Sequence, residues 1–559
     1  MVFLYKIQPM KNCIFILIAL LSTQVFSQET YSSLISKAEK LVEEDKKELA
    51  LDNYTKAFNL HKDSINNFDL YDAAELSNKI GKSNQSFYFL EKLIQRYPKL
   101  YPGWYFILDK DSKVKFKNLL SDKRWQNLEA TSNKISKRFY DSIQLTNDEF
   151  FRTKKSTKLE INDKKGLYKS LRNSSSYLPK KEQNYSIFFP INDTLKSSYF
   201  IHLPKNYNPE RKYPMLIFLH GAVFFSEFEK FSTDEDLKGW NRFYTKYADQ
   251  HDIILVFPKA DKRYNWMTEK GFYMIPEIVQ QIKSTINVDD NKVFLTGHSN
   301  GATGSFNYLV KQPTSFAGFY GFNTQPIVRT GGTFIQNALN RSYINFSTDL
   351  DYYFPPQAND DLTALMQSLH IDYKDYRYNG YPHWFPEFNG SEPAYKILFD
   401  DLLNRKRNPF PNKLIWETDD VKYGKVDWIE ITKLDTISPN KEWQKNYNFK
   451  ITKWLEYDDN DSLQVKDMDK MAFNFPRKSG QIKANYSKNR FDIATSSIKS
   501  FRLYISPEMI NLNKKLKVYA NNELIYNQKI DYNPSFMQDN FNKNMDKLQV
   551  WIDYIDFES

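Results

Sequence analysis

The sequence predicts a multidomain protein with three parts: an N-terminal α-helical, repeat-like segment, a central α/β domain, and a C-terminal, mainly antiparallel β domain. Three observations predict this order. Apolar residues recur at helical spacing up to residue 133, continuous apolar runs alternate with helix-like stretches over residues 184–407, and apolar and polar residues alternate over residues 408–559. With 559 residues, of which 41% are hydrophobic, the chain is long enough to build several cores.

The first 27 residues have the layout of a secretory signal peptide. A short basic stretch at Met10–Asn12 precedes the apolar run Cys13–Leu21, and the small residues Val25 and Ser27 stand at −3 and −1 of a cleavage site before Gln28. This apolar run is too short to span a bilayer, so we expect no stable membrane span, with an uncleaved anchor as the alternative. We therefore expect an exported protein, either periplasmic or extracellular.

Cysteine content and charge exclude several kinds of site. Cys13 is the only cysteine of the chain, so the mature protein would have no disulfide, no thiol nucleophile and no cysteine-based metal site. An exported protein without disulfides suggests a bacterial source. The net charge of +10 comes mostly from lysines spread along the whole chain. We interpret this charge as solvated surface and predict no nucleic-acid partner, because no aromatic-basic motif accompanies it.

Residues 28–133 are predicted to be helical. In "KAEKLVEEDKKELALDNYTKAFNL" the apolar residues recur at spacings of three, four and seven, which is typical of amphipathic helices, and a second stretch repeats the pattern around a turn at Gly81. The segment resembles tetratricopeptide-type helical pairs, in which small residues such as Ala57 and Ala73 allow helices to pack closely. An ordinary helical bundle is the alternative. The segment could bind a protein partner.

Residues 134–183 are rich in lysine and serine and are predicted to be a linker. From residue 184 the pattern changes to strands, and "SIFFPI" and "SSYFIHLP" flank the turn Asn192-Asp193, which predicts a hairpin. The runs "MLIFLHG", "IILVFP" and "KVFLTG" are each followed by a helix-like stretch. This alternation predicts a mostly parallel sheet with helices on both faces over residues 184–407.

Residues 408–559 are predicted to form a β-rich domain. Stretches such as "RFDIATSSIKSFRLYISP" and "KLKVYANNELIYNQKI" alternate apolar and polar residues between turn residues, and Asn521-Asn522 is a hairpin turn signal. A sandwich is one architecture that this pattern allows. Such a domain could bind a glycan or another surface.

The stretch "VFLTGHSNGATGSF" places Ser299 in a Gly-x-Ser-x-Gly pentapeptide between an apolar run and a helix-like stretch. This placement predicts a nucleophile elbow, a sharp turn that exposes the serine Oγ at the end of the sheet. Gly297 and Gly301 would permit a close backbone approach that a Cβ would block. The helix beginning at Asn300 would point its N-terminus at the site and favour a developing negative charge. A tight turn without chemistry is the alternative.

A serine nucleophile needs a base, and the base needs an orienting acid, here in the chain order serine, acid, histidine. Two histidines follow Ser299: His370 at a predicted helix-to-strand junction, and His383 in the loop after the last predicted strand of the α/β domain. We predict His383 as the base, because the catalytic histidine belongs on such a loop. Asp351, three residues before a Phe-Pro pair, is the predicted acid, and Asp349 is the alternative.

The oxyanion formed by attack on a carbonyl needs two backbone N–H donors. One is predicted at Asn300, directly after the serine, and the other at Ala222, in the loop after "LIFLHG". His220 is expected to shape this loop without titrating during the reaction. Trp266 and Trp384 could line an acyl or aryl pocket, or they could pack in the core.

With these motifs, residues 184–405 resemble the α/β-hydrolase superfamily. "LIFLHGA", "NVDDNKVFLTGHSNGATGSF" and "GYPHWFP" are most similar to secreted esterases of the polyhydroxybutyrate-depolymerase and feruloyl-esterase type. The resemblance implies a serine esterase with a Ser299–His383–Asp351 triad, an acyl-enzyme intermediate, an ester substrate that is small or polymer-derived, and neither cofactor nor metal. The chain departs from many of these esterases in carrying "HGAVFF" in place of a glycine-rich loop, and Phe346-Ser347-Thr348 where a glycine is usual.

Two other functions fit part of the pattern. Serine peptidases of the prolyl-oligopeptidase type share the elbow and the triad, but they usually carry a β-propeller ahead of the catalytic domain, and here the leading segment is helical. A non-catalytic binding protein on a hydrolase scaffold is the other alternative, and the intact order of serine, acid and histidine argues against it. The sequence contains no glycine-rich phosphate loop.

Overall fold

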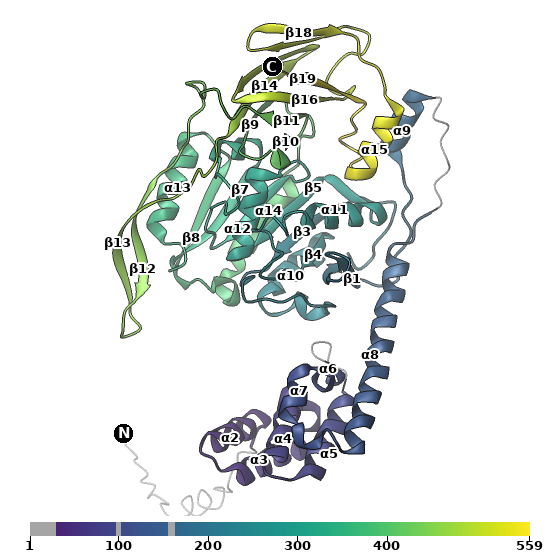
Figure 1. Ribbon diagram of the computed structural model, residues 1–559, viewed down its shortest axis with the longest axis vertical. Coiled ribbons are helices and arrows are strands. Elements are labelled where there is room, and N and C mark those ends of the chain that lie inside the picture. The colour runs from purple at the N-terminus through teal and green to yellow at the C-terminus, as the bar shows by residue number, and fades with distance from the viewer. Residues whose placement is uncertain (1–28, 97–101, 155–162, 559) are drawn as a thin grey trace, which may run out of the picture. The chain divides into compact units, whose positions relative to one another are not determined.

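The computed structural model describes residues 29–96, 102–154 and 163–558, so the predicted signal peptide lies outside the described residues. The chain divides into two compact units, Met1–Asp141 and Ser142–Ser559 (Figure 1). Among the described residues, no helix is both long enough and apolar enough to cross a membrane.

The first unit is helical, as predicted. The helices among its described residues are α2 (Tyr31–Glu43), α3 (Lys47–Leu60), α4 (Asn67–Lys79), α5 (Ser83–Ile94), α6 (Gly103–Leu108), α7 (Lys110–Lys115) and the first part of α8 (Lys123–Phe150), with 3-10 turns at η1 (Lys62–Ser64) and η2 (Lys117–Leu119). Helix α2 packs against α3, and α4 packs against α5. Thr30 and Asn66 cap α2 and α4 by accepting backbone N–H groups. Ala57 and Ala73 are fully buried, which permits the close packing of helices expected of them, whereas the repeat itself stays a prediction.

The second unit is built around a sheet of eight strands. These are β1 (Asn184–Pro190), β2 (Lys196–His202), β3 (Tyr213–Leu219), β4 (Ile254–Pro258), β5 (Val288–Gly297), β6 (Gly318–Phe322), β7 (Ser342–Leu350) and β8 (Tyr373–Pro382). Their order across the sheet is β1-β2-β4-β3-β5-β6-β7-β8. Strands β1 and β2 form the predicted hairpin, β2 pairs antiparallel with β4, and all pairs from β4 to β8 are parallel. The prediction of a mostly parallel sheet is therefore confirmed.

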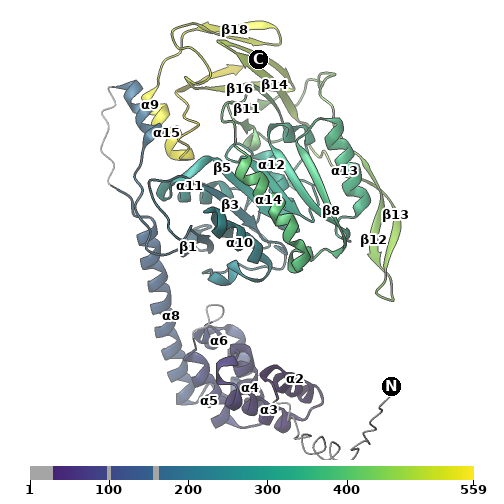
Figure 2. The same cartoon turned by 180° about the vertical axis from the view of Figure 1, so that it is seen from behind.

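Helices cover both faces of this sheet (Figures 1 and 2). One face carries α11 (Met274–Thr285), α12 (Asn300–Lys311) and α13 (Pro356–Ser368), and the other carries α10 (Arg242–His251) and α14 (Glu392–Asn404). In β3, Met215 and Ile217 belong to the first of these cores and Leu216 to the second, because successive side chains of a strand point to opposite faces. The 3-10 turns of this unit are η3 (Asp234–Leu237), η4 (Gly239–Asn241), η5 (Ile335–Asn340), η6 (Phe385–Glu387), η7 (Asn389–Ser391) and η8 (Val421–Tyr423).

The C-terminal part holds two β-sheets that share one core. The first has the order β10-β11-β16-β19 and the second β18-β17-β15-β14-β9. The strands are β9 (Lys413–Thr418), β10 (Lys425–Val426), β11 (Ile429–Leu434), β14 (Gly480–Ser487), β15 (Arg490–Ser496), β16 (Ile498–Ile505), β17 (Leu516–Ala520), β18 (Glu523–Gln528) and β19 (Asp553–Glu558). Trp416, Trp428 and Trp551 are buried in the shared core. The pairs are antiparallel except β15 with β17, and β17 turns into β18 at the predicted Asn521-Asn522 hairpin.

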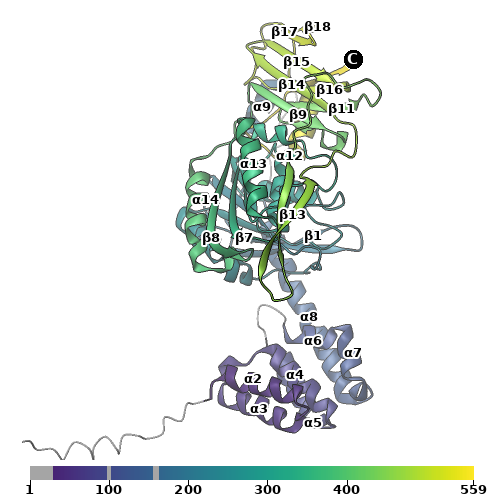
Figure 3. The same cartoon turned by 90° about the vertical axis from the view of Figure 1, so that its left-hand side faces the viewer.

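Two segments differ from the sequence expectation. The expected linker, residues 134–183, contains the second half of α8 and the helix α9 (Lys164–Asn173), which packs beside α15 (Pro534–Asn544) on the C-terminal core. Three apolar residues of α9 make this contact, too few to stand out in a lysine-rich stretch. The strands β12 (Lys450–Tyr457) and β13 (Leu463–Met471) leave the β domain as a separate ribbon (Figure 3). Strand β12 packs against α13 of the α/β domain.

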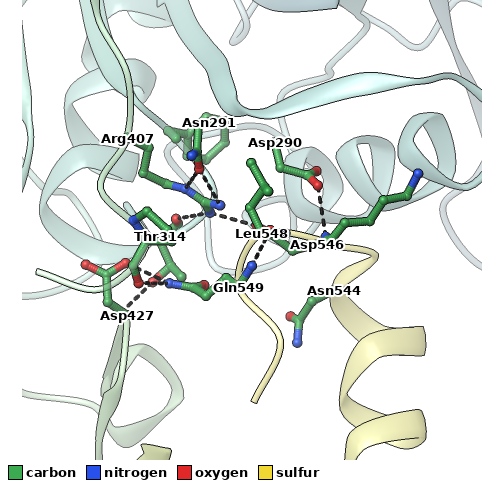
Figure 4. Close-up of polar contacts among 12 residues, drawn as sticks. Asp290, Asn291, Thr314, Arg407, Asp427, Asn544, Asp546, Leu548 and Gln549 are labelled. Carbon is green, nitrogen blue, oxygen red and sulfur yellow. Dashed lines mark hydrogen bonds and ion pairs between the residues drawn. The ribbon is translucent and has the colours of Figure 1, made fainter. Parts of the chain in front are cut away.

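A buried ionic network joins the α/β domain to the C-terminal segment (Figure 4). Nη1 of Arg407 lies 2.8 Å from Oδ2 of Asp546, and Nζ of Lys283 lies 2.8 Å from Oδ1 of Asp290 and 3.6 Å from Oδ2 of Asp546. Burial tends to raise the pKa of Asp546, but the charges of Arg407 and Lys283 outweigh it and lower the pKa to about 2. The carboxylate is therefore ionised and depends on both cations.

Replacing Arg407 with glutamine is expected to lower the free energy of unfolding by about 3–5 kcal/mol, because the buried Asp546 loses its closest cation. Urea unfolding of the full chain, followed by tryptophan fluorescence, measures the change. Arg211→Gln is the control, since the pair of Arg211 with Asp252 is exposed and contributes at most about 1 kcal/mol. Equal effects of the two substitutions would contradict the prediction.

Candidate active site

The turn between β5 and α12 has the geometry of the predicted elbow. Strand β5 ends at Gly297, helix α12 begins at Asn300, and Ser299 between them has φ 56° and ψ −121°, a strained conformation for a residue with a Cβ. A Cβ on Gly301 would lie 1.8 Å from the carbonyl oxygen of Leu219, so only glycine allows α12 to start this close to β3. The turn presents Ser299 at the carboxyl end of the parallel strands.

His383 and Asp351 follow the neighbouring strands β8 and β7 and form a buried pair. Nδ1 of His383 lies 2.8 Å from Oδ1 of Asp351, and the same oxygen accepts the N–H of Tyr353 at 2.9 Å. Because an ionised carboxylate only accepts, Nδ1 of the ring is the donor. Nε2 of His383 is buried and has no hydrogen-bond partner among the residues that the structure describes. The ring therefore presents a free acceptor nitrogen on the side away from Asp351.

The other candidates for acid and base have local roles. Oδ1 of Asp349 accepts the N–H of Gly380 at 2.7 Å and ties the end of β7 to β8. His370 lies between α13 and β8 with φ 57°, and it is not among the residues that line the cavity at Ser299. The sequence offers two candidate acids, Asp349 and Asp351, and two candidate bases, His370 and His383. The structure places Asp351 beside His383.

Two side chains that the sequence motifs do not point out hold the backbone of His383. Nε2 of His298 and Nδ2 of Asn323 each donate to the His383 carbonyl oxygen at 2.8 Å. Asn323 also donates to Oγ1 of Thr348 at 3.2 Å, and it has φ 53° directly after β6. His298 is visible in the sequence as a variable position of the pentapeptide. Asn323 has no local signal, because it is 60 residues from His383 in the chain.

The loop after β3 passes directly beside the serine. A Cβ on Gly221 would lie 3.1 Å from Cβ of Ser299. Nε2 of His220 accepts a backbone N–H, so its Nδ1 carries the proton and donates to the Gly221 carbonyl at 2.7 Å. In a trans peptide the next N–H points opposite to the carbonyl, so this bond turns the N–H of Ala222 away from the His220 ring. Ala222, with φ 54°, and Asn300 line the same cavity as Ser299.

This cavity has a volume of about 690 Å³, and Ser299 and His383 both line it. Trp384 also lines it and is 42% exposed, so its ring is accessible to a ligand. Trp266 does not line it: its side chain is 1% exposed, and its ring packs edge-on against His220 at 4.9 Å between ring centres. Of the two roles open to Trp266, burial of the ring against His220 favours core packing. The aromatic lining consists of Phe218, Phe224, Phe225, Trp240, Tyr353 and Trp384.

His298 is buried and His220 is half-buried, and the loss of contact with water lowers the basicity of both rings. The pKa of His220 is lowered to about 4 by burial. The pKa of His298 is lowered to about 3 by burial together with the charge of the neighbouring His383. Both rings are therefore neutral near pH 7 and serve as fixed hydrogen-bonding groups, His220 for the loop at Ala222 and His298 for the backbone of His383.

We expect the protein to lose stability as the pH falls from about 6.5 toward about 4. In the unfolded chain both histidines bind a proton near their ordinary pKa, whereas in the folded chain they bind one only near pH 4 and pH 3. The unfolded state then holds more protons, so the free energy of unfolding falls by about 1 kcal/mol per pH unit for each histidine. Urea unfolding at pH 7, 6 and 5 measures this slope.

Three variants test whether His220 and His298 cause this dependence of the free energy of unfolding on pH. His220→Gln and His298→Gln should each make it shallower, whereas His251→Gln, which replaces an exposed histidine of α10, should leave it unchanged. The prediction fails if all variants keep the slope of the unchanged protein.

Comparison with protein families gives one match. Residues 195–322 match the family model described as "Putative esterase". This range runs from the start of β2 to the end of β6 and includes Ala222, Ser299 and Asn300, but neither Asp351 nor His383. The match supports a serine hydrolase. It covers less than half of the chain, and no curated protein matches the sequence.

Solved structures with similar coordinates include several esterases. A thermostable esterase is 19% identical with a TM-score of 0.34, and the match covers 40% of this chain and 64% of that protein, just under two thirds of its length. A ferulic acid esterase is 15% identical with a TM-score of 0.32, covering 39% of this chain and 96% of the other. The S-formylglutathione hydrolase of Staphylococcus aureus is 14% identical with a TM-score of 0.31, covering 39% and 100%.

Proposed function

We propose that this protein is a serine esterase that cleaves carboxylic esters through Ser299, His383 and Asp351. The observation that carries the proposal is the buried pair of His383 and Asp351: Nε2 of His383 has no hydrogen-bond partner among the described residues, and His383 lines the cavity that the strained Ser299 also lines. A base oriented by an acid on one side and open on the other is the arrangement that activates a serine hydroxyl. The family match over residues 195–322 supports the same class of reaction.

In the proposed mechanism, Nε2 of His383 takes the proton from Oγ of Ser299 as Oγ attacks the ester carbonyl carbon. Asp351 stabilises the imidazolium that forms. The N–H groups of Ala222 and Asn300 hold the oxyanion of the tetrahedral intermediate. His383 then donates its proton to the departing alkoxide, which leaves as the alcohol and yields the acyl-enzyme. Water, deprotonated by His383, attacks the acyl group in the same way and releases the acid and free Ser299.

Asn300 is suited to this role by its place in α12. As the first residue of the helix it has an N–H without a partner inside the helix, and the positive end of the helix dipole lies at the same point. Ala222 is suited because His220 fixes the peptide plane that carries its N–H. Both donors are thus oriented before a substrate arrives, so little reorganisation is needed during the reaction.

The proposal includes export of the mature chain after removal of residues 1–27, on the signal-peptide layout of that segment. Mass spectrometry of the protein recovered from a bacterial host tests it: a chain that starts at Gln28 outside the cytoplasm supports export, and an intact leader in the cytoplasm contradicts it.

The helical unit is proposed to bind a protein partner, because its helices are amphipathic pairs of the kind used in tetratricopeptide repeats.

A substrate panel with covalent labelling tests the function. The mature chain is given p-nitrophenyl acetate and butyrate beside aminoacyl p-nitroanilides, and it is then labelled with a fluorophosphonate, followed by peptide mass mapping. Ester turnover with the label on Ser299 supports the esterase. Turnover of the anilides alone replaces it with the peptidase. A folded protein that cleaves neither substrate and takes up no label would leave only a binding function.

A further inference from the structure

The cavity at Ser299 contains a single formally charged cation. Among the described side chains that line it, Arg329 is the only arginine or lysine, and none is an aspartate or glutamate. No carboxylate among the described residues lies within ion-pair distance of its guanidinium, and its nearest polar contact is to a neutral amide. Arg329 is exposed, so its guanidinium is accessible to a ligand of the opposite sign that enters the cavity beside the candidate catalytic serine.

Two residues that line the cavity lie next to the exposed Arg329 side chain. Nη2 of Arg329 lies 3.5 Å from Oε1 of Gln325, and its guanidinium carbon lies 5.6 Å from the centre of the Phe224 ring. The backbone carbonyl of Gln325 accepts the hydroxyl of Thr303 at 3.0 Å. Thr303 follows Ser299 by one turn of α12, about 6 Å along the axis. Gln325 thus links Arg329 to the first turn of α12, and no contact between Arg329 and Ser299 is found among the described residues.

The surroundings of Arg329 are apolar and exposed. Phe225 is 93% exposed and Phe224 is 40% exposed, and both line the cavity. Exposed aromatic rings beside a cleft are typical of a binding surface. Here they could contact the part of a substrate that lies between its ester group and a charged end. A guanidinium binds carboxylates better than any other side chain because its planar N–H groups match both oxygens.

We propose that Arg329 forms an anion subsite of this cavity, so that the preferred substrate is an ester carrying a carboxylate away from the scissile bond. The proposal rests on the proposed esterase function. It assigns no step of the reaction to Arg329: the guanidinium binds the remote carboxylate, and the carbonyl stays at Ser299.

The test compares anionic and neutral esters of equal length. The acyl series uses mono-p-nitrophenyl esters of adipic and suberic acid beside p-nitrophenyl hexanoate and octanoate. The alcohol series uses 4-acetoxybenzoate beside its methyl ester. At pH 7 the free carboxylates are ionised. The quantity measured is the ratio of kcat/KM for the anionic ester to that for its neutral partner.

Arg329→Gln is expected to lower this ratio about 3–5-fold in at least one series, as for an exposed ion pair, through a higher KM for the anionic ester. Arg329→Glu should lower it further, because the charge is reversed. Added salt should reduce the ratio of the unchanged protein and have less effect on Arg329→Gln. Lys262→Gln, which removes an exposed cation outside the cavity lining, should keep the original ratio.

The outcomes separate the two proposals. If neutral and anionic esters are both cleaved and the ratio is the same in all four proteins, the anion subsite is wrong and the esterase stands. If the protein cleaves no ester of either series, the proposed function fails, and the subsite fails with it. Thermal melting of each variant establishes that a changed ratio comes from a folded protein.

Discussion

Replacing Ser299 with alanine is expected to lower kcat for p-nitrophenyl butyrate by about six orders of magnitude, leaving a residual acceleration of about 10³–10⁴-fold over the uncatalysed reaction. Without Oγ no acyl-enzyme can form, and only the acceleration from the oxyanion donors and from substrate binding remains. The measurement is a progress curve at high protein concentration, with the spontaneous hydrolysis subtracted.

Ser305→Ala is the matched control for this variant. Ser305 lies on the same helix, and its hydroxyl donates to the carbonyl of Leu295 in the core rather than facing the cavity. This variant is expected to keep most of the activity and to lose some stability. If Ser299→Ala retains substantial turnover while Ser305→Ala loses it, the assignment of the nucleophile is wrong.

Asp351→Asn is expected to lower kcat by about 10⁴-fold at pH 7. The amide can donate to Nδ1 of His383, which would place the ring proton on Nε2, the nitrogen that must accept the proton of Ser299. Because the geometry changes little, KM should stay close to its original value, and the loss should be in kcat. Steady-state kinetics with p-nitrophenyl butyrate separate the two parameters.

Asp349→Asn tests the alternative acid, which lies at the end of β7, two residues before Asp351. Its Oδ1 accepts the N–H of Gly380, a bond that the amide oxygen of asparagine can keep. We therefore expect only a modest loss of activity and of stability. A large loss in Asp349→Asn together with a small loss in Asp351→Asn would reverse the assignment.

Local patterns predicted the central fold well. The apolar runs that became β3, β4 and β5 are contiguous in the chain, and a buried parallel strand needs no distant residue to be recognisable. The β17–β18 hairpin was predictable as well, because its turn signal, Asn521-Asn522, consists of adjacent residues. Segments whose place depends on a distant surface were harder. Helix α9 and the β12–β13 ribbon pack against α15 and α13, partners far away in the sequence.

The candidate site shows the same division. Ser299 was predictable because an elbow is made of five adjacent residues with glycine at two of them. Asp349 and Asp351 stand two residues apart at the end of β7, so only the position of the His383 ring distinguishes them. From the sequence alone, Trp266 could face either the cavity or the core. The burial of its side chain favours the core.

By itself the sequence determined the order of a helical segment, an α/β domain and a β domain, together with the serine elbow, because these follow from periodicity and from adjacent residues. Only the tertiary structure decided that Asp351 pairs with His383, that His298 and Asn323 hold the histidine loop, and that Arg329 faces the cavity of Ser299. These residues come from strand ends and loops that are distant in the chain. They meet because the carboxyl ends of parallel strands lie at one edge of the sheet, which no local pattern records.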